Sequence, residues 1–169
     1  MLRPIVRLGD PVLQQPAATV AVFDAELDRL IDDMIETMYA APGIGLAAPQ
    51  IGVPQRVCVI DLSIGKQGGE LITLINPEFL AREGMQLEDE GCLSVPGFNA
   101  TVARPGRVTV RAADRTGQTR VIEATGLLAR ACQHEIDHLE GRLFLDRLRG
   151  LKRDMITRRI RKLQRTGKW

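Results

Sequence analysis

The chain has 169 residues, of which 44% are hydrophobic, 26% charged and only 4% aromatic, and its formal net charge is +2. This composition is typical of one globular domain with an aliphatic core, and it excludes a low-complexity chain. No apolar stretch is long enough for a signal peptide or a membrane span, so we expect a cytoplasmic protein whose three cysteines stay reduced.

The first half of the chain predicts one helix and two strands. Residues 24–40 carry apolar side chains at helical spacing, after an aspartate that can act as the N-cap. Residues 42–55 contain three prolines and three glycines and are predicted to form a loop. Apolar runs at 56–62 and 71–76 indicate buried strands, and we expect the proline after the second run to end that strand.

The second half predicts a hairpin and two helices. Residues 107–113 and 118–124 form strands around a glycine turn, and residues 126–139 form a helix that Gly141 ends. The basic segment 148–162 predicts a third helix. Because helices flank a block of strands, we expect an α+β fold rather than alternating βαβ units.

Charge is distributed unevenly along the chain. From Arg142 onward there are eleven Lys or Arg and two Asp, a net charge of +9, so the preceding part carries −7. We divide the chain into a body, residues 1–147, and a basic helix and tail, residues 148–169, which belongs to the same domain or is appended to it. The tail is either a solvated helix that packs Ile156 and Ile160 on the body, which we favour, or a contact for a polyanion.

The chain has only two histidines, His134 and His138, and both lie in the segment QHEIDH on the predicted second helix. Each residue turns a helix by about 100°, so the two imidazoles share one stripe and Glu135 lies beside them. In an HExxH motif the imidazoles bind a divalent metal and the glutamate takes a proton from the metal's water. A chance pair on a solvated face fits poorly with the apolar residues around it.

A third metal ligand must come from elsewhere in the chain. Asp146 and Asp154 remain open but lie at the edge of the basic tail. Cys58 lies in an apolar strand and Cys132 points away from the histidines, so both are predicted to be core residues. Cys92, in the stretch EGCLSVPG, is our preferred ligand, because a Cys/His/His set with an open position is typical of catalytic sites.

Three segments in this order, GIGLAAPQ, EGCLS and QHEIDH, resemble the signature motifs of the peptide deformylases, and the resemblance spans nearly the whole chain. It implies an α+β fold in which antiparallel sheets pack around a central metal-binding helix, with further helices at both ends. It also implies hydrolysis of the N-terminal formyl group from N-formylmethionyl nascent polypeptides, with release of formate.

The resemblance implies a role for each motif residue. The metal ligands would be Cys92, His134 and His138. The metal would be Fe²⁺, with Zn²⁺, Ni²⁺ or Co²⁺ as substitutes. Glu135 would activate the metal-bound water, Gln50 and the Leu93 N–H would hold the developing oxyanion, and Gly45 would meet the substrate backbone. The residues alone favour such a role for Gln50 no more than an ordinary place in a loop.

A methionine side chain requires an apolar pocket. We expect its lining to be Ile44, Leu127, Leu128 and Ala131. Arg130 stands where related pockets often have an aliphatic residue, and Glu88 precedes the cysteine motif at another position on the pocket edge. We interpret both as solvent-facing charges at the rim. We also expect Arg104 to pair with Glu90 and brace the cysteine segment.

Two other functions remain open at this stage. A metallopeptidase or another metal-dependent amidase would use Asp146 or Asp154 as a ligand and would survive loss of Cys92. A non-catalytic, metal-stabilised binding module would need a fourth protein ligand and would survive loss of Glu135. Because no exposed apolar stripe is left over, we expect a monomer with no membrane partner. A weak ribosome contact through the basic tail stays open as the alternative to a solvated helix.

Overall fold

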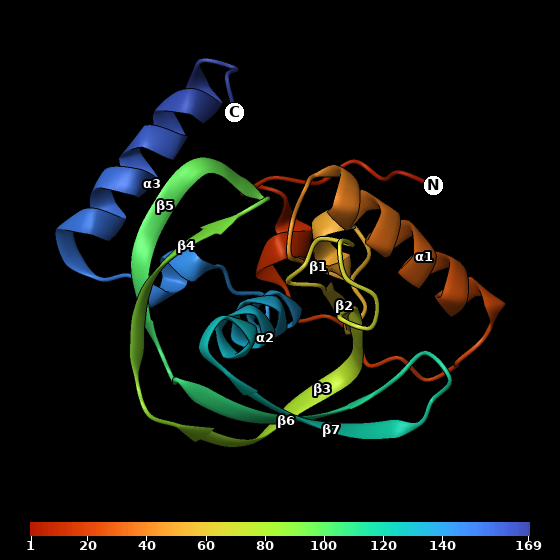
Figure 1. Cartoon of the computed structure of the whole chain (residues 1–169). Helices are drawn as coiled ribbons and strands as arrows, with labels where there is room; N and C mark the ends of the chain where they lie inside the picture. Colours follow the sequence, from red (N-terminus) through yellow and green to blue (C-terminus); the bar gives the residue numbers. More distant parts are fainter.

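Figure 1 shows the computed structural model, which describes all of residues 1–169. A short 3-10 helix, η1 (Pro11–Gln14), precedes helix α1 (Ala25–Ala40). Helix α1 begins as predicted, because the Asp24 side chain accepts a hydrogen bond from the Leu27 N–H at 3.0 Å. Its apolar face is buried against the sheet, and its other face is exposed.

Five antiparallel strands form the main sheet, in the spatial order β1-β2-β3-β6-β7. Their bounds are β1 Gly45–Ala47, β2 Val57–Ile60, β3 Ile72–Glu83, β6 Arg107–Ala113 and β7 Thr119–Thr125. The predicted hairpin is confirmed as β6 and β7. Its turn is fixed by Asp114, whose side chain accepts hydrogen bonds from the backbone N–H groups of Thr116 and Gln118.

The expectation that the second strand ends before Pro77 is wrong, since β3 continues to Glu83. The pairing of β3 with β6 shifts register between Ile75 and Glu78, and Asn76 adopts a positive φ of 52°. The proline therefore lies in a bulge, where its missing N–H removes no ladder hydrogen bond.

Two further strands were not predicted. Strands β4 (Gln86–Cys92) and β5 (Val95–Arg104) form a separate two-stranded sheet, so EGCLSVPG contains the tip of a hairpin and not a free loop. Strand β4 was not predicted because its sequence is polar, and the sequence is polar because most of its side chains are exposed. The predicted loop at 42–55 likewise contains β1 and a 3-10 helix, η2 (Ala48–Ile51).

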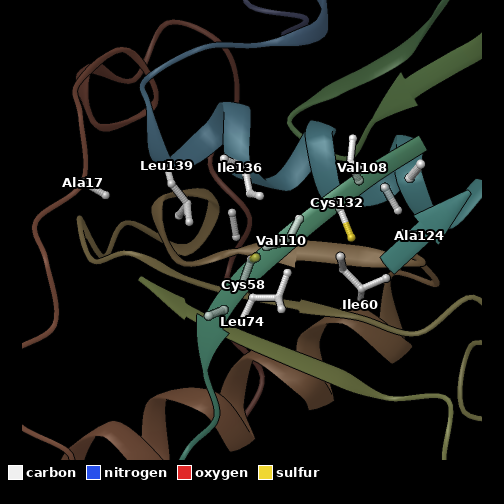
Figure 2. Packing of buried hydrophobic residues seen from close by; sticks show 14 residues of the cluster. Ala17, Cys58, Ile60, Leu74, Val108, Val110, Ala124, Cys132, Ile136 and Leu139 are labelled. Atoms are coloured by element: carbon white, nitrogen blue, oxygen red, sulfur yellow. The ribbon is translucent and has the colours of Figure 1, made fainter. Parts of the chain in front are cut away.

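Helix α2 (Gly126–Leu139) lies at the centre of the molecule, surrounded by the strands of both sheets (Figure 1). Every residue from 129 to 139 is buried. One face packs against β2, β3 and β6, where Cys132 and Ile136 meet Cys58, Leu74 and Val110 (Figure 2). This confirms the central helix, and both cysteines are core residues as expected.

The chain ends in a 3-10 helix, η3 (Phe144–Arg147), and in helix α3 (Gly150–Arg165), close to the predicted range. Ile156 and Ile160 are buried in one cluster with Val95 and Phe98 of β5, so α3 packs on the outside of the hairpin (Figure 1). None of the helices combines the length and the apolar character needed to cross a membrane.

Candidate metal centre

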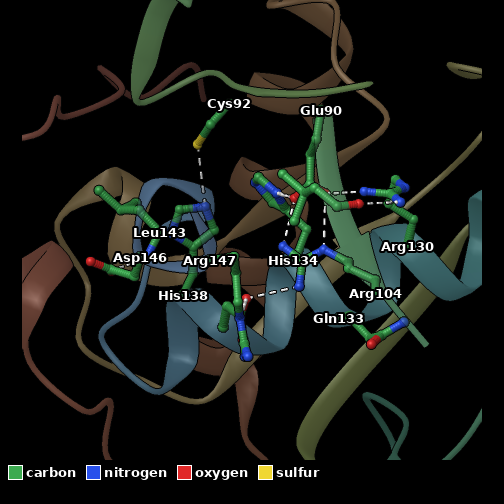
Figure 3. Close-up of polar contacts among 12 residues, drawn as sticks. Glu90, Cys92, Arg104, Arg130, Gln133, His134, His138, Leu143, Asp146 and Arg147 are labelled. Carbon is green, nitrogen blue, oxygen red and sulfur yellow. Dashed lines mark hydrogen bonds and ion pairs between the residues drawn. The ribbon is translucent and has the colours of Figure 1, made fainter. Parts of the chain in front are cut away.

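Three potential metal ligands converge between the hairpin and the central helix. Cys92 ends β4, and His134 and His138 lie one turn apart on α2. One ligand atom from each residue can be chosen so that all lie within 4.8 Å of one another. Cys92 Sγ is 3.4 Å from His138 Nε2 (Figure 3). Zinc binds sulfur at about 2.3 Å and imidazole nitrogen at about 2.0 to 2.1 Å, so these separations suit one tetrahedral ion.

The orientation of His134 is set by Glu90, which our sequence analysis had not connected with the histidines. His134 Nδ1 lies 2.5 Å from Glu90 Oε1, so Nε2 is left to face Cys92 and His138. A carboxylate behind a ligating imidazole fixes its tautomer and raises its basicity. The expected pair of Glu90 with Arg104 is confirmed, with N–O distances of 2.8 and 2.6 Å.

The buried charges shift the pKa values around the donor set. Burial alone would raise the pKa of Glu90, but hydrogen bonds from Arg104 and His134 hold it well below its usual range. Burial lowers the pKa of His138 well below its usual range, which favours the neutral imidazole. A neutral imidazole is the form that binds a metal ion.

Glu135 lies beside the donors, and it is buried, with 4% of the residue exposed. Its Oε2 atom has no hydrogen-bond partner in the protein. Burial in this surrounding raises the pKa of Glu135 to about 7. A buried carboxyl group with a free oxygen can accept and return a proton near neutral pH.

Gln50 comes from the 3-10 helix η2 and is almost completely buried. Its Oε1 atom accepts a hydrogen bond from the Ala47 N–H at 2.9 Å, which orients the amide so that Nε2 points to the donors. Nε2 lies 3.6 Å from Cys92 Sγ and 3.2 Å from Ser94 Oγ. The Ser94 N–H also donates to Cys92 Sγ, at 3.4 Å. The sulfur therefore has two N–H groups within hydrogen-bonding distance.

A cavity of about 480 Å³ opens onto this group. Seven of the residues expected to bind substrate or stabilise charge line it, namely Ile44, Gly45, Gln50, Leu93, Leu127, Ala131 and Glu135. Leu127 is 53% exposed, so it lies at the rim. Leu128 is not part of the lining, contrary to our expectation; it packs against the core cluster instead.

The interpretation of Arg130 as a solvent-facing charge is wrong, because the residue is 4% exposed and its guanidinium is hydrogen-bonded inside the protein. Glu88, in contrast, is exposed as expected. The sequence pattern misled us because a charge on a helix normally faces water unless a partner is buried with it. Here that partner is Glu90, 2.6 Å away.

The two alternative metal ligands do not join the donor set. Asp146 accepts a hydrogen bond from the Leu143 N–H and lies 3.5 Å from Arg153. Neither it nor Asp154 belongs to the group formed by the cysteine and histidines, and no fourth side chain completes that group. The chain therefore offers three potential ligands and no fourth, and an open site with three protein ligands is the arrangement of catalytic rather than structural metal sites.

An α+β fold with a cysteine sulfur, two imidazoles and a buried glutamate around one cavity is typical of a metal-dependent hydrolase. The model of the family "Polypeptide deformylase" matches residues 2–154. A peptide deformylase from Acidobacterium capsulatum is 56% identical over 169 residues, which cover 100% of this chain and 99% of that protein. The chain belongs to the polypeptide deformylase family, whose members remove the N-formyl group from nascent polypeptides.

Solved structures agree with this assignment. The crystal structure of a peptide deformylase from Legionella pneumophila is similar with a TM-score of 0.91 and 48% identity, covering 99% of this chain and 98% of that one. A peptide deformylase from Synechococcus elongatus, solved in complex with actinonin, has a TM-score of 0.88 and 41% identity, covering 99% and 90%. The predicted deformylase fold is confirmed.

Proposed function

We propose that this chain hydrolyses the formyl group of N-formylmethionyl nascent polypeptides with a divalent metal held by Cys92, His134 and His138. The observation that carries the proposal is the meeting of the three motif segments around one cavity, with Glu135 and Gln50 next to the sulfur and imidazole donors. We propose Fe²⁺ as the native metal, with Zn²⁺, Ni²⁺ or Co²⁺ as substitutes, since a mixed thiolate and imidazole set accepts each of them.

When bound, such an ion lowers the pKa of water and polarises a carbonyl group. Glu135, which lines the cavity, accepts the proton of the attacking water. As water adds to the formyl carbon and the carbon–nitrogen bond breaks, Glu135 passes this proton to the departing amine. The second proton of the water also reaches the amine, so formate and a methionyl ammonium group result, and Glu135 returns to its starting charge.

Negative charge develops on the formyl oxygen as water adds. Gln50 Nε2 is aimed at the donor group before substrate arrives, because the Ala47 N–H holds the other end of the amide. The backbone N–H of Leu93, in the turn that follows Cys92, is the second proposed donor. Donors that are already oriented stabilise the transition state more than the ground state.

Substrate binding is assigned to the apolar part of the cavity. Ile44, Leu127 and Ala131 would contact the methionine side chain, and Gly45 would meet the peptide backbone. Because β1 is the edge strand of the five-stranded sheet, its outer edge carries backbone groups that an extended peptide can pair with.

For the cellular setting, we propose a cytoplasmic monomer whose basic C-terminal helix makes a weak, salt-dependent ribosome contact. The face of α3 that carries Ile156 and Ile160 is buried. The basic side chains of the helix remain exposed, among them Lys152, Arg158, Arg161 and Lys162. Ribosome binding that is unchanged by truncation after about Gly150 would contradict this contact.

The test of the function is formate release from a short N-formylmethionyl peptide by protein purified without oxygen and loaded with Fe²⁺. We expect turnover that Glu135→Gln abolishes while the variant still binds one metal per chain. Actinonin, which the Synechococcus elongatus relative binds, should inhibit the reaction. A wild-type protein that binds metal but releases no formate would contradict the proposal.

A further inference from the structure

Arg130 is a buried charge on α2, one helical turn before His134, with 4% of its side chain exposed. It donates three hydrogen bonds: from Nε to Gln86 Oε1 at 3.1 Å, from Nη1 to Glu90 Oε2 at 2.6 Å and from Nη2 to the Val102 carbonyl at 2.8 Å. A planar guanidinium held along three edges has a fixed position. Figure 3 shows it beside Glu90.

The three acceptors belong to the β4–β5 hairpin, which forms a sheet of its own. This hairpin carries Cys92, whereas α2 carries His134 and His138. No backbone hydrogen bond joins the hairpin to α2. Side-chain contacts must therefore set the separation of the thiol from the imidazoles, and Arg130 supplies three of them.

Arg130 also completes the hydrogen bonding of Glu90. Oε1 of this carboxylate accepts from Arg104 and His134, and Oε2 accepts from Arg104 and Arg130. A carboxylate has about four lone-pair sites, so all of them are used. Without Arg130 the Oε2 atom would keep only one of its two donors, Arg104, so the carboxylate that aims the His134 ring would be held less firmly.

We propose that Arg130 is a positioning residue for deformylation: it clamps Glu90 and the cysteine hairpin to α2 and so holds Cys92 and His134 at the spacing one metal ion requires. The inference rests on the proposed function, because that function assigns the metal to these residues. It concerns a residue that no signature motif contains and that our sequence analysis placed in solvent.

The test compares Arg130→Met, which keeps the length of the side chain without its donors, with Arg130→Lys and with a control, Arg107→Met. Arg107 is 53% exposed and pairs with Glu123 at the surface, at 3.5 Å. Each variant is loaded with Co²⁺. We would measure the rate of cobalt loss to a chelator, the visible absorption of the bound cobalt, and kcat and KM for an N-formylmethionyl peptide.

We expect Arg130→Met to lose cobalt at least about 10-fold faster than wild type, as is usual when a group behind a metal ligand is removed. Its cobalt absorption should shift, and kcat should fall with KM changed less than about twofold. Arg130→Lys should lose cobalt at a rate between those of wild type and Arg130→Met, because a lysine keeps the charge but cannot reach three acceptors together. Arg107→Met should match wild type.

Two results would overturn the inference. One is cobalt loss and absorption in Arg130→Met within about twofold of wild type; the other is a rise in KM alone, which would make Arg130 a substrate contact. If Arg130→Met does not fold, cobalt loss from Arg130→Lys at the wild-type rate overturns it instead. Failure of the proposed function is separate, because it appears as wild-type protein that holds cobalt and releases no formate.

Discussion

Gly45 and Glu135 meet where the edge strand β1 passes the middle of the central helix. A Cβ atom on residue 45 would lie 2.7 Å from Glu135 Oε1 and 3.0 Å from its Cδ. Glu135 is buried on a helix that is itself enclosed, so it has little room to yield. The absence of a side chain at residue 45 leaves room for the Glu135 carboxylate beside the group formed by Cys92, His134 and His138.

Gly45→Ala should therefore lower kcat by about 100-fold while the protein stays folded, since a displacement of about 1 Å at a catalytic group has effects of this size. The measurement is steady-state formate release with one metal per chain. Gly68→Ala is the matched control, because a Cβ there meets nothing within 4 Å. Equal activity of the two variants would show that Glu135 can move aside without loss.

Tyr39 and Asp61 give a second prediction at the scale of single residues. The Tyr39 hydroxyl donates to Asp61 Oδ2 at 2.6 Å, and burial together with this bond raises the pKa of Tyr39 to about 12. A tyrosine has a pKa of about 10 in an unfolded chain. Folding favours the protonated form of the Tyr39 hydroxyl. Its contribution to the free energy of unfolding is therefore complete below about pH 10 and is lost as the pH rises toward 12.

Tyr39→Phe should lower the free energy of unfolding by about 1.5 to 3 kcal/mol at pH 8, the usual effect of losing a hydrogen bond to a charged group. The difference from wild type should shrink to zero as the pH approaches 12. Denaturant unfolding of both proteins at pH 8, 10 and 11.5 measures it. A difference that stays constant across this range would mean that the hydroxyl does not ionise there.

At the scale of elements, the sequence predicted the helices and strands whose apolar residues recur at regular spacing. It missed strands that form only because they pair with another strand. The helices at 24–40 and 126–139 and the hairpin from 107 to 124 have strong periodic patterns, and they are present. Strand β4 has an exposed, polar sequence, so its pairing with β5 could not be read from local preference. The group of Cys92, His134 and His138 could be predicted from residue spacing and from the motifs. The contacts of Glu90 with His134 and Arg130 could not, because they depend on how the hairpin packs against α2.

Helix α3 should contribute to stability through its two buried side chains, Ile156 and Ile160. Ile160 is 2% exposed and belongs to the cluster beneath the hairpin, while Leu151 on the same helix is 73% exposed. Ile160→Ala should cost about 2 to 4 kcal/mol in the free energy of unfolding, whereas Leu151→Ala should change it by less than about 0.5 kcal/mol. Denaturant unfolding measures both. Equal effects would mean that α3 does not depend on this contact.

At the scale of the whole molecule, the metal would join two parts of the structure, the β4–β5 hairpin and helix α2, between which there is no backbone hydrogen bond. Cys92 belongs to the small sheet, and His134 and His138 belong to the helix enclosed by both sheets. An ion bound by all three therefore links the hairpin to the core. A ligand that binds only the folded chain adds to its stability according to its concentration relative to its Kd.

Metal removal should thus lower the thermal unfolding temperature. At a metal concentration about 1,000 times the Kd, the contribution to the free energy of unfolding is about 4 kcal/mol. Thermal unfolding of wild type and Cys92→Ala, each with metal or with chelator, tests this. The wild-type transition should move to lower temperature with chelator, and the variant should respond far less. A large, equal response in both would place the metal elsewhere.

The central position of α2 has a consequence for how the chain folds during synthesis. Strands β1, β2 and β3 bury their apolar side chains against a helix that begins only at Gly126, so they leave the ribosome long before the surface that covers them. Contacts so distant in sequence form slowly, and the exposed strands can aggregate in the meantime. A nascent chain that stops before Gly126 should therefore remain a client of chaperones, and release of the last 44 residues should mark the point at which it becomes protease-resistant.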